Sequence, residues 1–202
     1  FIESFQDDTN LGTQTDVDRT SGYINTAFST NEHVNDSNTI LLLHGNGSDA
    51  STTITDSSSN AYTMTAAGNA QIDTAQKKYG TGSILFDNTG DTVTNSHSDF
   101  DAGFGTADFT IEMWYRPSSS TGWDTWISKG GGSGDSGTGS SYAGWYFQKN
   151  NSTRVYFNVR DGSGEVAELF SGTLSWSADT WYHMAICKDS SDDFFMYRDG
   201  AQ

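Results

Sequence analysis

The stretch Phe109-Thr-Ile-Glu-Met-Trp-Tyr115 decides the fold class of this chain. Side chains of a β-strand alternate between the two faces of a sheet. The apolar set at every second position is therefore expected on one face: Phe109, Ile111, Met113 and Tyr115. Pro117 ends the strand, because proline has no backbone N–H to donate to a neighbouring strand. The stretch predicts a strand that lays one face on a core.

Composition extends this prediction to the whole chain. The 202 residues include 22 Gly, a single Pro and many Ser, Thr, Asn and Asp, which favour polar turns between short strands. Aromatic residues make up 13% of the chain and bury large areas, so a core forms despite a hydrophobic content of only 34%. We expect an all-β fold, a two-sheet antiparallel sandwich, with no helix and no internal repeat. Further strands are expected at 40–43, 52–55, 61–65, 83–86, 91–94, 123–128, 144–148, 154–159, 165–170, 181–188 and 194–197.

The two ends of the chain differ in character. Residues 1–38 are polar with scattered apolar positions, which predicts an irregular N-terminal arm or linker that is ordered only against a partner. Residues 39–202 are predicted to form the sandwich. Asp199-Gly200 is a typical hairpin turn, yet only Ala201 and Gln202 follow it. We therefore expect the last strands of the sandwich to lie beyond Gln202.

The charge of the chain excludes some partners. Its formal net charge is −16, from 26 acidic and 10 basic residues. A negative field of this size repels nucleic-acid backbones, and no apolar run approaches the length of a membrane span. We therefore expect neither nucleic acid as a partner nor insertion into a membrane. The charge suits divalent cations, although a merely solvated acidic surface is the alternative. Cys187 is the single cysteine, which excludes an internal disulfide and predicts a buried, inert thiol.

Catalytic patterns are missing from the sequence. Glycosidases place paired carboxylates at alternate positions of a strand, but Glu112 has no acidic residue at positions 110 or 114. Glu165 and Glu168 are three residues apart, so they face opposite sides of a strand. The four histidines show no metal-binding spacing. The sequence therefore predicts a protein that is not an enzyme.

Four signatures in a fixed order carry a resemblance to a known family. They are Leu41-Leu42-Leu43-His44, Asp56-Ser-Ser-Ser-Asn60, Asp108-Phe-Thr-Ile-Glu-Met-Trp114 and Thr180-Trp-Tyr-His-Met184, and Lys78-Tyr-Gly-Thr-Gly-Ser83 lies between the second and third. In this order they resemble the laminin-G-like branch of the concanavalin A-like lectin and glucanase jelly rolls. The resemblance covers 39–202 and implies a two-sheet antiparallel jelly roll that lacks its closing strands. It also implies a binding or structural module.

The arm and the polar composition resemble modules of tailed-phage structural proteins. This likeness implies a non-enzymatic virion structural or adhesion protein, a tail or head appendage, located at the virion surface or outside the cell. The expected partners are other virion subunits or further copies of the chain, held through the arm, and surface glycans bound by the lectin-like sandwich. The alternative is a carbohydrate-binding module of a secreted bacterial protein, and a glycoside hydrolase is the less favoured third.

Related jelly rolls often hold one structural Ca²⁺, and the resemblance implies such a site here. Ca²⁺ takes six to eight oxygen ligands from flexible loops. Asp56 and Asn60 lie in one polar loop, and Asp87 and Asp91 flank another turn. If the loops converge, these four residues form the site. The alternative is that they cap turns through hydrogen bonds to their own backbone.

Aromatic residues near the Gly-rich stretch 130–141 are candidates for carbohydrate binding, because exposed rings stack on sugar faces. The candidates are Trp123, Trp126, Tyr142 and Trp145. The alternative is that these rings belong to the core or to an interface.

Overall fold

The computed structural model describes residues 32–87, 90–97, 108–129, 143–150, 153–161 and 165–202. Every regular element in these ranges is a strand, which confirms the predicted all-β class. No helix of the described chain is long and apolar enough to cross a membrane. The chain forms two compact units, which we call the N-terminal unit (described residues 32–97) and the C-terminal unit (described residues 108–202).

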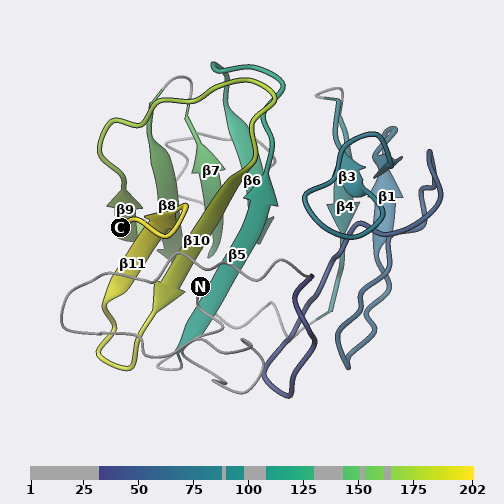
Figure 1. Cartoon of the computed structure of the whole chain (residues 1–202). Coiled ribbons are helices and arrows are strands. Elements are labelled where there is room, and N and C mark those ends of the chain that lie inside the picture. Colours follow the sequence, from purple (N-terminus) through teal and green to yellow (C-terminus); the bar gives the residue numbers. More distant parts are fainter. Residues whose placement is uncertain (1–31, 88–89, 98–107, 130–142, 151–152, 162–164) are drawn as a thin grey trace, which may run out of the picture. The chain divides into compact units, whose positions relative to one another are not determined.

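One sheet of the C-terminal unit has three antiparallel strands in the order β11-β10-β5 (Figure 1). These are β5 (Phe109–Tyr115), β10 (Tyr182–Lys188) and β11 (Phe194–Arg198). The register pairs Met184 with Met113 and Ile186 with Ile111. The alternating residues of β5 therefore lie beside the alternating residues of β10, and together they make one apolar face.

The other sheet of this unit is a four-stranded meander in the order β6-β7-β8-β9. It consists of β6 (Asp124–Lys129), β7 (Ala143–Lys149), β8 (Val155–Asp161) and β9 (Glu165–Phe170). Figure 1 shows this sheet behind β5, β10 and β11. The two sheets form the predicted sandwich.

The core of the sandwich lies between the two sheets. Phe147 and Phe157 come from the four-stranded sheet and Met184 and Ile186 from the three-stranded one, and all four side chains are buried. The Phe147 and Phe157 ring centroids are 6.2 Å apart in an edge-on contact, a favoured geometry for aromatic pairs. Because a strand alternates its faces, this burial fixes which side chains of β7 and β8 face away from the core.

A bulge in β6 turns an extra aromatic residue inward. The pairing of β6 with β7 shifts between Thr125 and Ile127, so one residue is left without a ladder partner. That residue is Trp126, whose ring centroid lies 4.9 Å from that of Phe147 and 5.0 Å from that of Tyr115. The sequence alternation of 123–128 did not show this bulge.

A buried charge pair closes one end of the core. The Lys149 side chain is fully buried, and its Nζ lies 2.7 Å from Asp124 Oδ2 and 2.7 Å from the Gly122 carbonyl oxygen. The Tyr115 hydroxyl donates to the same Asp124 oxygen. Burial, and then the hydrogen bond to Asp124 and its charge, raise the pKa of Tyr115 far above its ordinary value. The hydroxyl therefore stays a donor, and the network joins β5, β6 and β7.

The N-terminal unit has shorter strands. β1 (Thr65–Ala67) pairs with β4 (Thr92–Thr94), and β2 (Gln71–Asp73) pairs with β3 (Ser83–Leu85). Its buried apolar side chains among the described residues are Ile54, Ala70 and Ile72. Gly45 has a φ of +69°, and a side chain there would meet the backbone of Ser83. A glycine is therefore required at this close approach.

The expected strand at 40–43 does not form, and the loop after it explains why. Leu42 N–H donates to Asp56 Oδ1 at 3.0 Å, and the Leu42 carbonyl accepts from Ser57 N–H at 2.8 Å. The backbone groups of Leu42 are thus used by the 56–60 loop instead of a neighbouring strand. The predicted limits of 1–38 for the arm and 39–202 for the sandwich stay a prediction.

The core can be tested at Phe157. We expect Phe157→Ala to lower the unfolding free energy of the C-terminal unit by about 3–5 kcal/mol, because the truncation leaves a cavity between the sheets. All six Trp of the chain lie after residue 107, so Trp fluorescence during urea unfolding reports this unit alone. The control is Phe170→Ala at a half-exposed ring, expected to cost under about 1 kcal/mol. Equal losses for the two variants would contradict the described core.

Candidate functional site

The outward side of the four-stranded sheet carries polar and aromatic side chains in two rows. Since Phe147 and Phe157 face the core, their neighbours along the strands face away from it. The strand register aligns these neighbours across the sheet. One row is Thr125, Gln148, Tyr156 and Phe170, and the other is Ser128, Tyr146, Asn158 and Glu168. We call these eight residues, with Arg160 of β8, the outer face.

Contacts within the first row hold its side chains in place. Thr125 Oγ1 donates to Gln148 Oε1 at 3.2 Å. The Tyr156 and Phe170 ring centroids are 6.0 Å apart, and the Arg154 guanidinium lies 5.1 Å from the Phe170 ring centroid. Phe170 is 52% exposed. The row therefore holds a Gln148 amide that is only 5% exposed beside two aromatic rings, one of which is open to solvent.

The second row has a polar centre. Asn158 is fully buried although it faces away from the core, and its Oδ1 accepts from Arg160 Nε at 3.1 Å. Tyr146 and Glu168 lie on either side of Asn158 in the register. Larger side chains thus surround a small amide on the middle strands. Hydroxyl, amide, guanidinium and carboxylate groups beside aromatic rings suit a polyhydroxylated ligand such as a saccharide.

The outer face was not predicted from the sequence. The signal that was available is the period-2 alternation of 144–148 and 154–159, which puts Tyr146 and Gln148, and Tyr156 and Asn158, on one side of their strands. Only the register shows that the two strands align these residues in rows.

Of the three described residues predicted to bind carbohydrate, two belong to or pack against the core and one is exposed. Trp123 precedes β6 and is 50% exposed, as a stacking ring requires. Trp145 is buried in the core cluster, and Trp126 packs against that cluster. These two rings take the alternative place considered for them, the core. Tyr142 lies outside the described residues.

Two of the predicted calcium ligands belong to one hydrogen-bonded loop. Asp56 Oδ1 accepts from the N–H groups of Leu42 and Ser58, and Oδ2 accepts from Tyr62 N–H and the Ser58 hydroxyl, all within 3.0 Å. Asn60 Nδ2 donates to the Ile40 carbonyl oxygen at 2.9 Å. Burial raises the pKa of the Asp56 carboxyl, but these hydrogen bonds outweigh it, and the net pKa lies below the ordinary value. The carboxylate organises the loop.

The other two predicted ligands surround Asn69. Asp91 accepts from the N–H groups of Asn69 and Asp87, at 2.8 and 2.7 Å, and Asp87 Oδ2 accepts from Asn69 Nδ2 at 2.6 Å. The first pair thus bonds to residues within 40–62, and the second pair bonds to Asn69 and within itself. Among the described residues, no three His, Cys, Asp or Glu side chains are grouped so that they could hold a metal ion. The calcium site stays a prediction.

Glu112 has an imidazole partner from the neighbouring strand. Its Oε2 lies 3.2 Å from His183 Nε2, and the His183 ring centroid is 5.1 Å from that of Trp114. His183 N–H donates to Asp199 Oδ1 at 2.8 Å. The His183 side chain is only 6% exposed. The Glu112–His183 pair joins β5 to β10, and the backbone hydrogen bond of His183 to Asp199 adds the turn after β11. The sequence could not show this pair, because β5 and β10 lie far apart in the chain.

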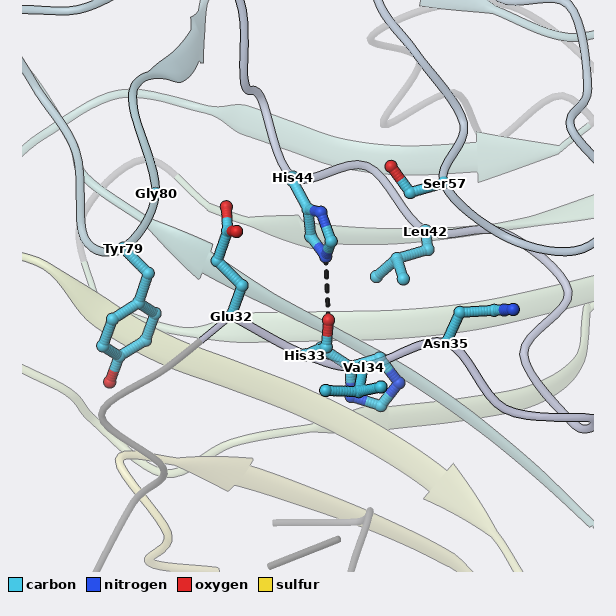
Figure 2. Close-up of a pocket in the computed structure, with 9 residues that line it drawn as sticks. All are labelled: Glu32, His33, Val34, Asn35, Leu42, His44, Ser57, Tyr79 and Gly80. Carbon is cyan, nitrogen blue, oxygen red and sulfur yellow. Dashed lines mark hydrogen bonds between the residues drawn. The ribbon is translucent and has the colours of Figure 1, made fainter.

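A hollow of about 500 Å³ lies in the N-terminal unit. Figure 2 shows the Glu32 carboxylate and the Tyr79 ring on one side of it and His44 and Leu42 beyond them. The other lining residues are His33, Val34, Asn35, Ser57 and Gly80. The hollow was not predicted from the sequence.

One comparison with known proteins finds a match. The model of a laminin-G-type domain, described as concanavalin A-like lectin/glucanases superfamily, matches residues 86–202, more than half of the chain. No curated protein and no solved structure shows a significant match. The matched range contains every strand of the sandwich.

Asp56 gives the N-terminal unit a pH dependence that can be measured. Folding lowers the pKa of the Asp56 carboxyl. The contribution of this carboxylate to the free energy of unfolding is therefore complete above the ordinary pKa of 3.8, and it is lost as the pH falls through the lowered value. We expect the urea midpoint, followed by the Tyr62 amide signal in NMR, to fall between about pH 5 and about pH 2. We also expect Asp56→Ala to lower the free energy of unfolding by about 3 kcal/mol at neutral pH, because it leaves buried N–H and O–H donors without an acceptor.

Asp56→Asn is the matched variant, since it keeps the shape of the side chain and removes the titration. Its midpoint should change less with pH than that of the native chain. An unchanged pH dependence in Asp56→Asn would contradict the role of this carboxylate.

Proposed function

Because the chain belongs to the concanavalin A-like lectin/glucanases superfamily, we propose that it is a non-catalytic, glycan-binding module that uses the outer face. The observation that carries the proposal is the pair of cross-strand rows, in which aromatic rings lie beside amide, hydroxyl and carboxylate groups. A sugar ring has apolar C–H faces and a rim of hydroxyls. Rings such as Tyr156 and Phe170 suit the faces, and groups such as Arg160 and Glu168 suit the rim.

The sandwich holds this surface rigid. β7 and β8 are the middle strands of their sheet, and their inward residues are anchored in the core. A surface whose side chains are already fixed loses little conformational entropy when a ligand binds. The outer face therefore supports recognition of a preformed shape, whereas Trp123 lies outside a regular strand.

The setting that we propose is a virion-surface or extracellular structural or adhesion protein. The arm of residues 1–38 holds it to other virion subunits or to further copies of the chain. The net charge of −16 suits a surface that stays soluble and repels nucleic acid. A carbohydrate-binding module of a secreted bacterial protein would use the same face but act as a monomer. The mass of the particle in solution separates the two settings.

Glycan binding can be tested at Tyr156. We expect Tyr156→Ala to weaken binding to the best glycan of an array by about tenfold or more, since the ring supplies a stacking surface in the middle of the sheet. Binding is measured by calorimetry with that glycan. The matched control is Tyr197→Ala on β11, a half-buried ring of the other sheet, which should leave affinity unchanged.

Trp123→Ala distinguishes the outer face from a site at the end of the sandwich. If Trp123→Ala abolishes binding while Tyr156→Ala has no effect, the binding surface is the loop before β6, and the outer face is rejected. If no glycan binds to the native chain, the proposed function itself is wrong.

A further inference from the structure

We propose that the hollow of the N-terminal unit binds the protonated amine of a small polyhydroxylated molecule, of the amino-sugar class, with the Glu32 carboxylate as its counter-ion. This site lies in a different unit from the outer face and does not depend on the function proposed for that face. The proposal rests on the way the wall of the hollow is built, on the placement of the Glu32 carboxylate, and on the chemistry of the other lining residues (Figure 2).

Residues 32–35 form one wall, and three side-chain hydrogen bonds fix it to the rest of the unit. Asn46 Nδ2 donates to Glu32 Oε1 at 2.5 Å. His44 Nε2 lies 2.9 Å from the His33 carbonyl oxygen, and Asn35 Nδ2 donates to Ser59 Oγ at 2.9 Å. Bonds at three of four successive residues hold this segment in one conformation. The hollow is therefore a preformed feature of the unit.

The Glu32 carboxylate is positioned by the turn at 79–81. Asn46 Oδ1 accepts from Thr81 N–H at 2.6 Å and from the Thr81 hydroxyl at 2.9 Å, which orients its Nδ2 toward Glu32. Gly80 has a φ of +63°, and a Cβ there would collide with Glu32 Oε1 and Asn46 Oδ1. The absence of a side chain at Gly80 thus leaves the space that the carboxylate occupies. Such support is typical of a group that must keep its position.

The lining favours a ligand that donates hydrogen bonds. A carbonyl oxygen only accepts, so His44 Nε2 is the donor to His33, and Nδ1 of the neutral ring is then an acceptor. Glu32 is the one acidic residue among the lining residues, and none of them is Lys or Arg. A protonated amine donates three hydrogen bonds and carries the charge opposite to that of the carboxylate.

The remaining lining residues suit the body of a sugar. Leu42 and Val34 are apolar, and Ser57 and Tyr79 supply hydroxyls. A volume of about 500 Å³ is within the usual range of small-molecule sites and accommodates a single sugar ring.

The test compares probes that differ only in the amine. Glucosamine, N-acetylglucosamine and glucose are titrated into the full chain at about pH 7, below the usual pKa of an α-amino group. Binding is followed through the NMR signals of Gly80 and Thr81. We expect glucosamine to bind about tenfold more tightly than either neutral sugar, because a charge-assisted hydrogen bond is about twice as strong as a neutral one.

Two charge variants localise the effect. Glu32→Gln keeps the acceptor for Asn46 and removes the charge, so it should abolish the preference for glucosamine and leave the glucose affinity unchanged. Asp179→Asn removes the same charge from an exposed residue of the other unit and should leave the preference intact. Equal binding of the three sugars, no binding of glucosamine, or equal losses in the two variants would overturn the proposal. Loss of glycan binding in Tyr156→Ala tests the outer face alone and leaves this result unaffected.

Discussion

The packing of Phe147 and Phe157 against Met184 and Ile186 is the interaction on which the rest of the structure depends. These side chains are buried between the two sheets, in the apolar cluster that the described residues of their unit form. Once they face inward, the alternation of a strand leaves no freedom for Tyr146, Gln148, Tyr156 and Asn158, which must face outward. The same contact that stabilises the sandwich therefore builds the surface to which we assign glycan binding.

The sequence predicted the features that follow from local alternation. The strand at Phe109–Tyr115, the two-sheet sandwich and the superfamily all follow from short-range patterns and their order. It did not predict features that need a partner distant in the chain. The backbone of Leu42 bonds to Asp56 instead of a strand, the bulge turns Trp126 inward, and Glu112 meets His183 across β5 and β10. Each of these depends on a contact with another segment of the chain, which a single segment does not show.

The same limit applies to the candidate sites. The tryptophans were predicted to stack on sugar rings. Because their side chains are large and apolar, Trp145 lies in the core and Trp126 packs against it. Their neighbours along the strands, such as Ser128 and Tyr146, occupy the outward positions. In the N-terminal unit, residues that are unremarkable one by one, such as Glu32, Asn46 and Gly80, meet around one hollow. The two units thus carry two surfaces of different chemistry, a broad polar sheet face and a small hollow with one carboxylate.

Cysteine labelling along β8 tests the central claim most directly, because it reads the facing of each residue. Single cysteines are placed at positions 155, 156, 157, 159 and 160, and their reaction with a thiol reagent is timed. The native Cys187 is a slow background, since burial and the charge of Asp189 raise its pKa to about 11. The account predicts fast labelling at positions 156 and 160 and protection at 155, 157 and 159. Uniform labelling, or the opposite alternation, would contradict the inward packing of Phe157 and with it the outer face.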